Sequence, residues 1–273
     1  HSGAISIRTS NRNFIGRSGT KDAKVFLVSP ESAVAAALTG KITDPRNMKT
    51  DYPVIEQPKH FYIDDSMFIQ PSGADDVFRG PNMGQPPKST EMPESLKAVV
   101  TIKLGDQITT DDIIPAGSVS RYRSNIEKSS DFIFQNIDPD FAKNCNDLKS
   151  QKLAAIIVAG ASYGQGSSRE HAAICPMYLG VRAVIAKSIE RIQMANLVNF
   201  GIMPLLFKEA DIYETLQRGD ELEIQDTFDG LRSGEFVISN NSQKNTFLVY
   251  HDLTPRQIDI VLHGGLLNYT AAG

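Results

Sequence analysis

Apolar runs of strand length alternate with helix-like segments in two parts of the chain. In the first part, residues 24–28 form an apolar run, and the Ser-Pro-Glu directly after it supplies the N-cap, the first-turn proline and the acidic residue of a helix start. The alanine-rich residues 32–38 come next and end at Gly40, a residue typical of helix C-termini. Residues 4–40 are therefore predicted to form two strands and a helix.

The second part begins near residue 96 and continues to the C-terminus. Its strands and helices alternate, which predicts a central, largely parallel sheet. Residues 221–251 instead predict short alternating strands joined by Asp-Gly and Ser-Gly turns. The predicted elements are strands at 98–102, 153–159, 181–186 and 202–207, a polar loop at 108–115, and helices that begin near Ser167 and at Ile189.

The segment between these two parts is rich in proline and lacks the alternation of strands and helices. Residues 41–93 contain eight of the 14 prolines of the chain and show weak periodicity. Such a composition favours an extended linker that runs over a surface and separates two domains. The predicted organisation is a first segment at 1–40, a linker at 41–92 and a second domain at 93–273, all in the α/β class.

The composition is that of an ordinary soluble globular protein, with 41% hydrophobic and 22% charged residues. A net charge of -4 and a pI near 5.8 give no general reason to expect binding to nucleic acids or anionic membranes. No apolar run approaches the roughly 20 residues that span a bilayer, and the N-terminus lacks the pattern of a signal peptide. We therefore expect a cytoplasmic protein whose anionic ligands meet a local cationic pocket.

The two cysteines, Cys145 and Cys175, lie far apart and show neither a C-x-x-C pattern nor a Cys/His spacing. The sequence therefore predicts neither a disulfide scaffold nor a zinc site. Two reduced, mostly buried thiols are the expectation. His60, His251 and His263 likewise show no spacing of metal ligands.

Candidate chemistry concentrates in residues 164–171, Gly-Gln-Gly-Ser-Ser-Arg-Glu-His, where a predicted strand ends and a helix starts. Glycines there allow a close approach of the backbone, and N–H groups of a first helical turn favour an anion. Ser167 and Ser168 add hydroxyl groups, and the Arg169 fork suits a carboxylate. The pattern predicts a carboxylate or phosphate site. The structural alternative is that the serines cap the helix and the arginine pairs with a nearby acid.

Residues 163–173 resemble the hallmark of the swivelling domain of aconitases, and residues 177–187 resemble the next segment of that domain in the family. Asn11, Arg12 and Arg17 lie in a segment that resembles the family signature N-R-N-F-x-G-R. The resemblance covers essentially the whole chain. It implies the end of a third α/β domain up to about residue 40, an interdomain linker, and a swivelling β/β/α fourth domain from about residue 93.

The resemblance implies an aconitate hydratase, which interconverts citrate and isocitrate through cis-aconitate. Ser167 matches the family's catalytic base, and Asp111 matches an acidic residue beside it, although an acid after two threonines is also typical of a turn or cap. Arg123 matches an arginine for the distal carboxylate of citrate, with Arg121 as the competing candidate. The other residues that match substrate contacts are Arg12, Arg17, Ser168 and Arg169, and Asn11 is a candidate support for the cluster.

The family's cofactor is a [4Fe-4S] cluster held by three cysteine thiolates. Cys145 and Cys175 match none of these positions, so the sequence predicts no metal ligand in this chain and cluster ligands upstream of it. The implied partners are a tricarboxylate substrate and missing N-terminal cluster-bearing domains, without which the chain is expected to be inactive. We favour a fragment over a natural subunit. The split in two-subunit members falls in the linker and would not leave the N-R-N-F segment attached to this half.

Several positions depart from the aconitase pattern. Asp112 is more like the isopropylmalate and homoaconitate branch, and Ser162, Ile189 and Gln193 are substitutions in the shell around the site. They leave open a related hydro-lyase acting on homoaconitate, methylcitrate or isopropylmalate. A non-catalytic, RNA-binding or regulatory relative is the alternative from another class. His171 is expected to make a structural hydrogen bond only.

Overall fold

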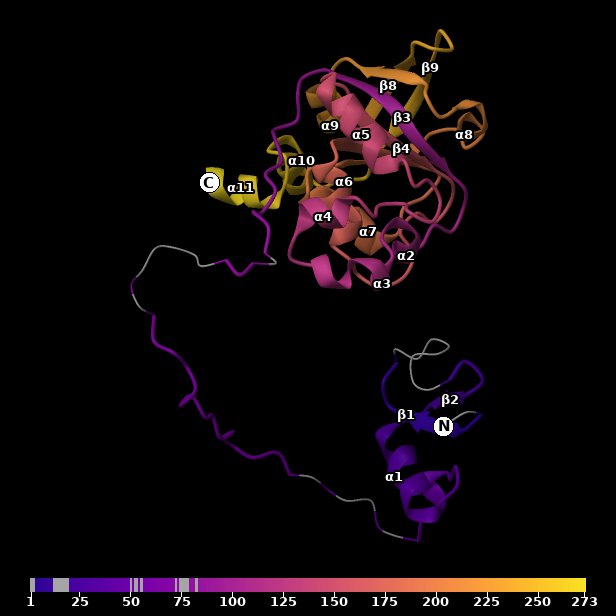
Figure 1. Ribbon diagram of the computed structural model, residues 1–273, viewed down its shortest axis with the longest axis vertical. Coiled ribbons are helices and arrows are strands. Elements are labelled where there is room, and N and C mark those ends of the chain that lie inside the picture. Colours follow the sequence, from indigo (N-terminus) through magenta and orange to yellow (C-terminus); the bar gives the residue numbers. More distant parts are fainter. Residues whose placement is uncertain are drawn as a thin grey trace. The chain divides into compact units, whose positions relative to one another are not determined.

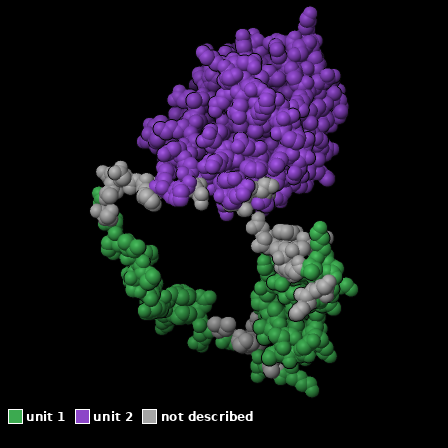
Figure 2. All heavy atoms as spheres, viewed as in Figure 1, with its two compact units in different colours: residues 1–74 green, residues 75–273 purple. Residues whose placement is uncertain are grey.

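A computed structural model describes residues 3–11, 20–49, 51, 54, 56–71, 73, 79–81 and 83–273. The chain divides into two compact units, residues 1–74 and 75–273, which are coloured separately in Figure 2. No helix among the described residues is both long enough and apolar enough to cross a membrane.

The described residues of unit 1 form a small parallel sheet and a helix. Strand β1 (Ile5–Arg8) pairs in parallel with β2 (Lys24–Leu27), and helix α1 (Pro30–Thr39) comes after them. Ser29 caps α1 by accepting a hydrogen bond from the Ser32 N–H, and Gly40 ends it in the left-handed region at φ 72°. The predicted strands and helix of residues 4–40 are confirmed. A single 3₁₀ turn, η1 (Pro45–Asn47), comes next.

Unit 2 is built on a closed seven-stranded barrel, seen in the upper part of Figure 1. The strand order is β3-β4-β5-β6-β9-β8-β7; β3 to β6 run parallel, and the remaining neighbours are antiparallel. The predicted parallel sheet therefore accounts for one side of the barrel. The strands are β3 (Leu96–Leu104), β4 (Ala154–Ala159), β5 (Val181–Ala186), β6 (Met203–Phe207), β7 (Glu221–Ile224), β8 (Glu235–Asn240) and β9 (Asn245–Tyr250).

Helices cover the parallel side of the barrel and its ends. All six residues of β4 are buried, because successive side chains enter two different cores. Ile156 and Val158 pack with residues of β8 and β9 inside the barrel, whereas Ile157 packs with residues of α5 and α6 outside it. The longer helices are α5 (Phe141–Ser150), α6 (His171–Tyr178), α7 (Arg191–Asn199), α9 (Thr227–Ser233), α10 (Pro255–Leu262) and α11 (Leu266–Ala272).

Short helical turns occupy the connection between β3 and α5. The predicted polar loop at 108–115 contains one such turn, α2 (Thr110–Ile113), which a reciprocal capping box between Thr109 and Asp112 fixes. The others are α3 (Ala116–Val119), η2 (Ser120–Tyr122) and α4 (Ile126–Ser130), and a further short helix, α8 (Ile212–Thr215), comes after β6.

The structure differs from the sequence-based predictions in two segments of unit 2. The helix expected near Ser167 begins four residues later, at His171. The Asp-Gly turn expected after residue 221 is instead inside helix α9, where Gly230 lies so close to Phe236 that a Cβ would stand 2.2 Å from its ring. The predicted Ser-Gly turn at Gly234 is the left-handed C-cap of that helix, at φ 85°. Packing of the helix against β8 therefore decides the conformation of this segment.

Candidate functional site

Backbone hydrogen bonds join the motif at 164–171 to the start of α2. The N–H groups of Gly164 and Gln165 both donate to the Ile108 carbonyl, at 2.7 and 2.9 Å, and the Thr110 N–H donates back to the Gln165 carbonyl at 2.8 Å. These bonds hold two segments, more than 50 residues apart in sequence, side by side. The consequence is that α2 presents Asp111 to the arginine of the motif.

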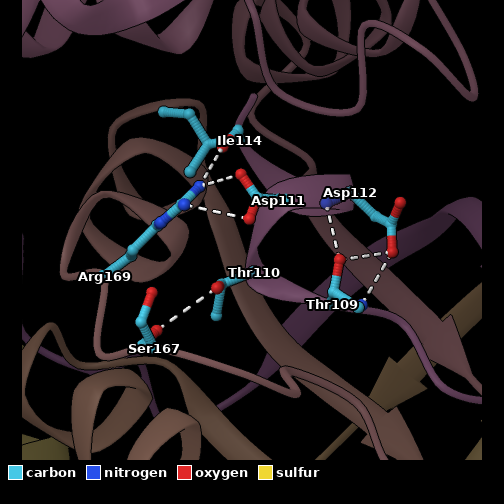
Figure 3. A network of polar contacts seen from close by, with 7 residues as sticks. All are labelled: Thr109, Thr110, Asp111, Asp112, Ile114, Ser167 and Arg169. Carbon is cyan, nitrogen blue, oxygen red and sulfur yellow. Dashed lines mark hydrogen bonds and ion pairs between the residues drawn. The ribbon is translucent and has the colours of Figure 1, made fainter. Parts of the chain in front are cut away.

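Arg169 makes a bidentate ion pair with Asp111 (Figure 3). Its Nη1 lies 2.5 Å from Asp111 Oδ1 and its Nη2 lies 2.9 Å from Oδ2, while Nη1 also donates to the Ile114 carbonyl at 3.1 Å. The Arg169 side chain is 17% exposed and the Asp111 side chain 62%. The predicted pairing with a nearby acid, which was the structural alternative, is therefore present.

The ion pair still leaves one edge of the Arg169 guanidinium available. Its Nε and the second hydrogen of Nη2 donate to no described residue, and these two N–H groups point along a single edge of the planar group. Such an edge binds a carboxylate through two parallel hydrogen bonds. Arg169 can therefore hold Asp111 and a ligand carboxylate at the same time.

Ser167 and Ser168 are exposed and lie in the loop before α6. The buried Thr110 hydroxyl donates to the Ser167 carbonyl at 3.2 Å, so the contact fixes the backbone of Ser167 and leaves its hydroxyl for other partners (Figure 3). The residue at the N-cap of α6 is Glu170, which makes no side-chain cap bond. The serines therefore do not cap this helix, contrary to the structural alternative.

The backbone of this loop offers a run of hydrogen-bond donors. The N–H groups of residues 166–171 donate to no acceptor in the described part of the chain. Ser167 was expected to sit in the first helical turn, and this placement is wrong because α6 starts at His171. Consecutive N–H groups of an irregular loop can nevertheless receive an anion as helix N-termini do.

Arg123 lies at the end of η2 and is exposed. Its backbone carbonyl accepts a hydrogen bond from His171 Nε2 at 2.8 Å, so His171 makes the structural hydrogen bond that the sequence predicted. The competing candidate, Arg121, has its guanidinium 4.7 Å from the Tyr122 ring centroid. Arg121 thus makes a cation–π contact with its neighbour, and both exposed arginines stay candidates for a ligand carboxylate.

The other three candidates, Asn11, Arg12 and Arg17, belong to the first segment of the sequence. Arg12 and Arg17 lie outside the described residues, and Asn11 is an exposed residue of unit 1 after β1. Among the candidates in unit 2, the structure brings together Asp111, Ser167 and Arg169.

Gln193 is a residue whose role sequence reasoning missed. It is buried under the motif, and a Cβ on Gly164, which has φ 88°, would stand 2.3 Å from Gln193 Cγ. Its Nε2 donates to the Ala172 carbonyl at 3.0 Å. That carbonyl would bond to the N–H of residue 176 in a regular helix, but Pro176 has none. A proline inside a predicted helix is the sequence signal that a side-chain donor is needed nearby.

The two cysteines do not suit the iron-sulfur cluster that the resemblance implies. Both are buried and form no disulfide, as the sequence predicted, and burial raises the pKa of each thiol to about 12. A cluster ligand must be a thiolate, which burial disfavours. No group of three or more His, Cys, Asp or Glu residues in the described ranges could hold a metal ion.

Comparisons with known proteins match two segments of the chain to family models. The model of the aconitase family (aconitate hydratase) matches residues 1–40, and the model of the aconitase C-terminal domain matches residues 113–210. A putative mitochondrial aconitate hydratase of Aspergillus fumigatus is 29% identical over 96% of this chain and 38% of its own length. The chain thus spans about two-fifths of the length of such relatives.

Shorter relatives match unit 2. The homoaconitase small subunit of Thermus thermophilus is 40% identical over 61% of this chain and 91% of its own length. A crystal structure of 3-isopropylmalate dehydratase from Methanocaldococcus jannaschii superposes with a TM-score of 0.52 and 30% identity, over 65% of this chain and 94% of that one. This likeness confirms the predicted α/β swivelling domain. The match of residues 1–40 to the aconitase family model agrees with the predicted partial segment before it. The chain belongs to the aconitase family.

Proposed function

We propose that this chain supplies carboxylate-binding and proton-transfer groups to an aconitate hydratase, which interconverts citrate and isocitrate through cis-aconitate. The observation that carries the proposal is Arg169, which Asp111 holds by one edge while the other edge stays available for a carboxylate. The shared motif and the family membership support it. Because the chain spans only part of such relatives, the activity is proposed for the complete protein.

The proposed roles depend on the position of each group. The Arg169 edge and the N–H groups of residues 166–171 bind one carboxylate of the substrate. Ser167 Oγ accepts the carbon-bound proton, and the positive potential of these donors favours its anionic form. Arg123 binds the distal carboxylate. Removal of water then needs an acceptor for the departing hydroxyl group, and we place that acceptor outside this chain.

The iron-sulfur cluster of the family, when bound, supplies a Lewis acid for the hydroxyl and carboxylate groups of the substrate. The described residues offer no ligand set for it. We therefore propose that a cluster-bearing portion of the protein, in the same or a partner chain, completes the site. The relative named as a small subunit supports an arrangement of this kind.

A related hydro-lyase that acts on homoaconitate is the second candidate. It is supported by the 40% identity to the homoaconitase small subunit of Thermus thermophilus. Asp112, which resembles that branch in sequence, does not add support, because its Oδ2 accepts from both the N–H and the hydroxyl of Thr109 at 2.8 and 2.6 Å. Asp112 acts as part of a helix cap.

The test is turnover of citrate, homoaconitate and isopropylmalate by the complete, cluster-loaded protein. We expect citrate to be converted, and Ser167→Ala to lower kcat by about 10²- to 10⁴-fold, the usual contribution of a positioned proton-transfer group. Ser239→Ala, on strand β8, is the matched control. Conversion of homoaconitate in preference to citrate would support the second candidate, and an unchanged kcat in Ser167→Ala would refute the role of Ser167.

A further inference from the structure

The segment that carries Arg123 is held through three successive carbonyl groups. The Tyr122 carbonyl accepts from Ser129 Oγ at 2.8 Å, and the Ser124 carbonyl accepts from the Gly84 N–H at 2.9 Å. Between them, the Arg123 carbonyl accepts from His171 Nε2 at 2.8 Å. Each donor comes from a different part of unit 2, so three separate contacts hold the backbone of this segment.

The His171 contact differs from the other two because it comes from the motif itself. His171 is the first residue of α6 and stands two residues after Arg169. Its hydrogen bond therefore joins the proposed site of one carboxylate to the backbone that carries the proposed site of another. Helix α4, which comes directly after the Arg123 segment, also packs against α6, so the two segments lie on neighbouring helices.

The chemistry of the contact is simple. A carbonyl oxygen only accepts hydrogen bonds, so Nε2 must carry a hydrogen. The neutral Nε2–H tautomer and the imidazolium both satisfy this requirement. The contact therefore holds the Arg123 backbone in either of these two forms of His171.

We infer that His171 is a positioning residue for substrate selectivity, which it exerts by fixing the backbone of Arg123. This inference rests on the proposed function. An exposed arginine reaches a distal carboxylate only if its backbone is in the right place, and an error of about 1 Å in such a site costs about 10²-fold in rate. His171 sets the separation between Arg123 and Arg169, and so the length of the acid that both can bind.

The experiment is a double-mutant cycle in the complete, cluster-loaded protein. His171→Phe keeps an aromatic ring and removes the donor, and Arg123→Ala removes the cation. For citrate we expect KM to rise about tenfold in His171→Phe with a smaller change in kcat, and to rise no further when His171→Phe is added to Arg123→Ala. His171→Gln, whose amide N–H can still donate, should restore most of the wild-type KM.

The comparison acid is isopropylmalate, whose alkyl group replaces the distal carboxylate. If turnover of this acid is measurable, its KM should be insensitive to His171→Phe. Equal rises in KM for both acids, or additive effects of the two substitutions on citrate, would overturn the inference, because either result would show that His171 acts without Arg123.

A second measurement separates this inference from the proposed function. Amide hydrogen exchange of residues 121–125 is measured on the chain itself, with no substrate and no turnover. We expect faster exchange in His171→Phe and wild-type exchange in His171→Gln. Unchanged exchange in His171→Phe would show that the His171 hydrogen bond does not fix this segment. If no acid were turned over by the wild type, the proposed function and the selectivity role would both fail, while exchange would still decide whether His171 holds the segment.

Discussion

Arg169 makes a structural ion pair and still has hydrogen-bond donors available for a ligand. Its Nη1 hydrogens go to Asp111 and to the Ile114 carbonyl, and the remaining edge points away from both. Side-chain entropy is largely lost already in the ion pair, so little more is lost when a carboxylate binds. The sequence predicted the arginine and Asp111 separately; their pairing needed the backbone contacts between residues 108 and 165.

Asp111→Asn tests this preorganisation. The amide keeps one acceptor for Arg169 but loses the charge and the bidentate geometry, so kcat/KM of the complete protein should fall about tenfold to hundredfold. The free energy of unfolding should change by less than about 1 kcal/mol, because the Asp111 side chain is 62% exposed. Steady-state kinetics and urea unfolding measure the two effects.

The matched control is Asp147→Asn, which breaks the exposed pair with Lys143 on α5. It should change unfolding by a similarly small amount and leave kcat/KM unchanged. If the two variants affected kcat/KM equally, the contact between Asp111 and Arg169 would have no special role in the site.

At the scale of elements, local signals predicted those boundaries that local chemistry decides. The Ser29 cap, Pro30 and Gly40 define α1 without help from the rest of the chain. The start of α6 and the existence of α9 were missed, because the first depends on hydrogen bonds to residues 108–110 and the second on packing against β8. Contacts between distant residues override propensity in both places.

Helix α6 contains Pro176 and depends on another element for its missing donor. Gln193→Leu should lower the free energy of unfolding by about 1–3 kcal/mol, because the Ala172 carbonyl is then buried without a partner. The cost should shrink when Pro176→Ala is present, since the new backbone N–H can bond to the same carbonyl. Urea unfolding of the four proteins measures this; an equal cost in both backgrounds would contradict the assignment.

Gly230 in α9 allows the helix to lie against β8. Alanine favours helices over glycine by about 1 kcal/mol, yet Gly230→Ala should destabilise the protein by about 1–3 kcal/mol, because its Cβ would stand 2.2 Å from the Phe236 ring. Gly105→Ala is the control, since nothing lies within 4 Å of its Cβ. Thermal unfolding should distinguish the two, and a stabilised Gly230→Ala protein would show that packing does not limit this position.

At the scale of the molecule, the order of strands around unit 2 is the part that the sequence did not predict. Alternation along the chain predicted that the strands β3 to β6 belong to a largely parallel sheet, but it gave no strand order, and closure needs β9 beside β6 and β7 beside β3. Period-two alternation fixes which face of a strand is buried and does not specify its neighbour. Closure is what encloses Ile156 and Val158, and it separates their core from the one that holds both cysteines.

The buried thiols connect this packing to the stability of the whole molecule at high pH. Burial raises the pKa of Cys145 and of Cys175 from 9.0 to about 12, so in the folded protein both thiols keep their protons where the unfolded chain loses them. The unfolded state then binds fewer protons, and stability must fall as pH rises above about 9, by up to about 1.4 kcal/mol per pH unit for each thiol. Below pH 9 this contribution is constant.

Urea unfolding at pH 8 and pH 10 therefore should show a larger loss of stability for the wild type than for Cys145→Ala or Cys175→Ala, even though each substitution lowers stability at pH 8 by leaving a small cavity. Other groups that titrate in this range, such as tyrosines, are common to all three proteins, so the difference between their losses isolates the thiols. Equal losses would mean that the cysteines are accessible to solvent in the folded protein, and the core that holds them would then be less closed than the burial of its side chains indicates.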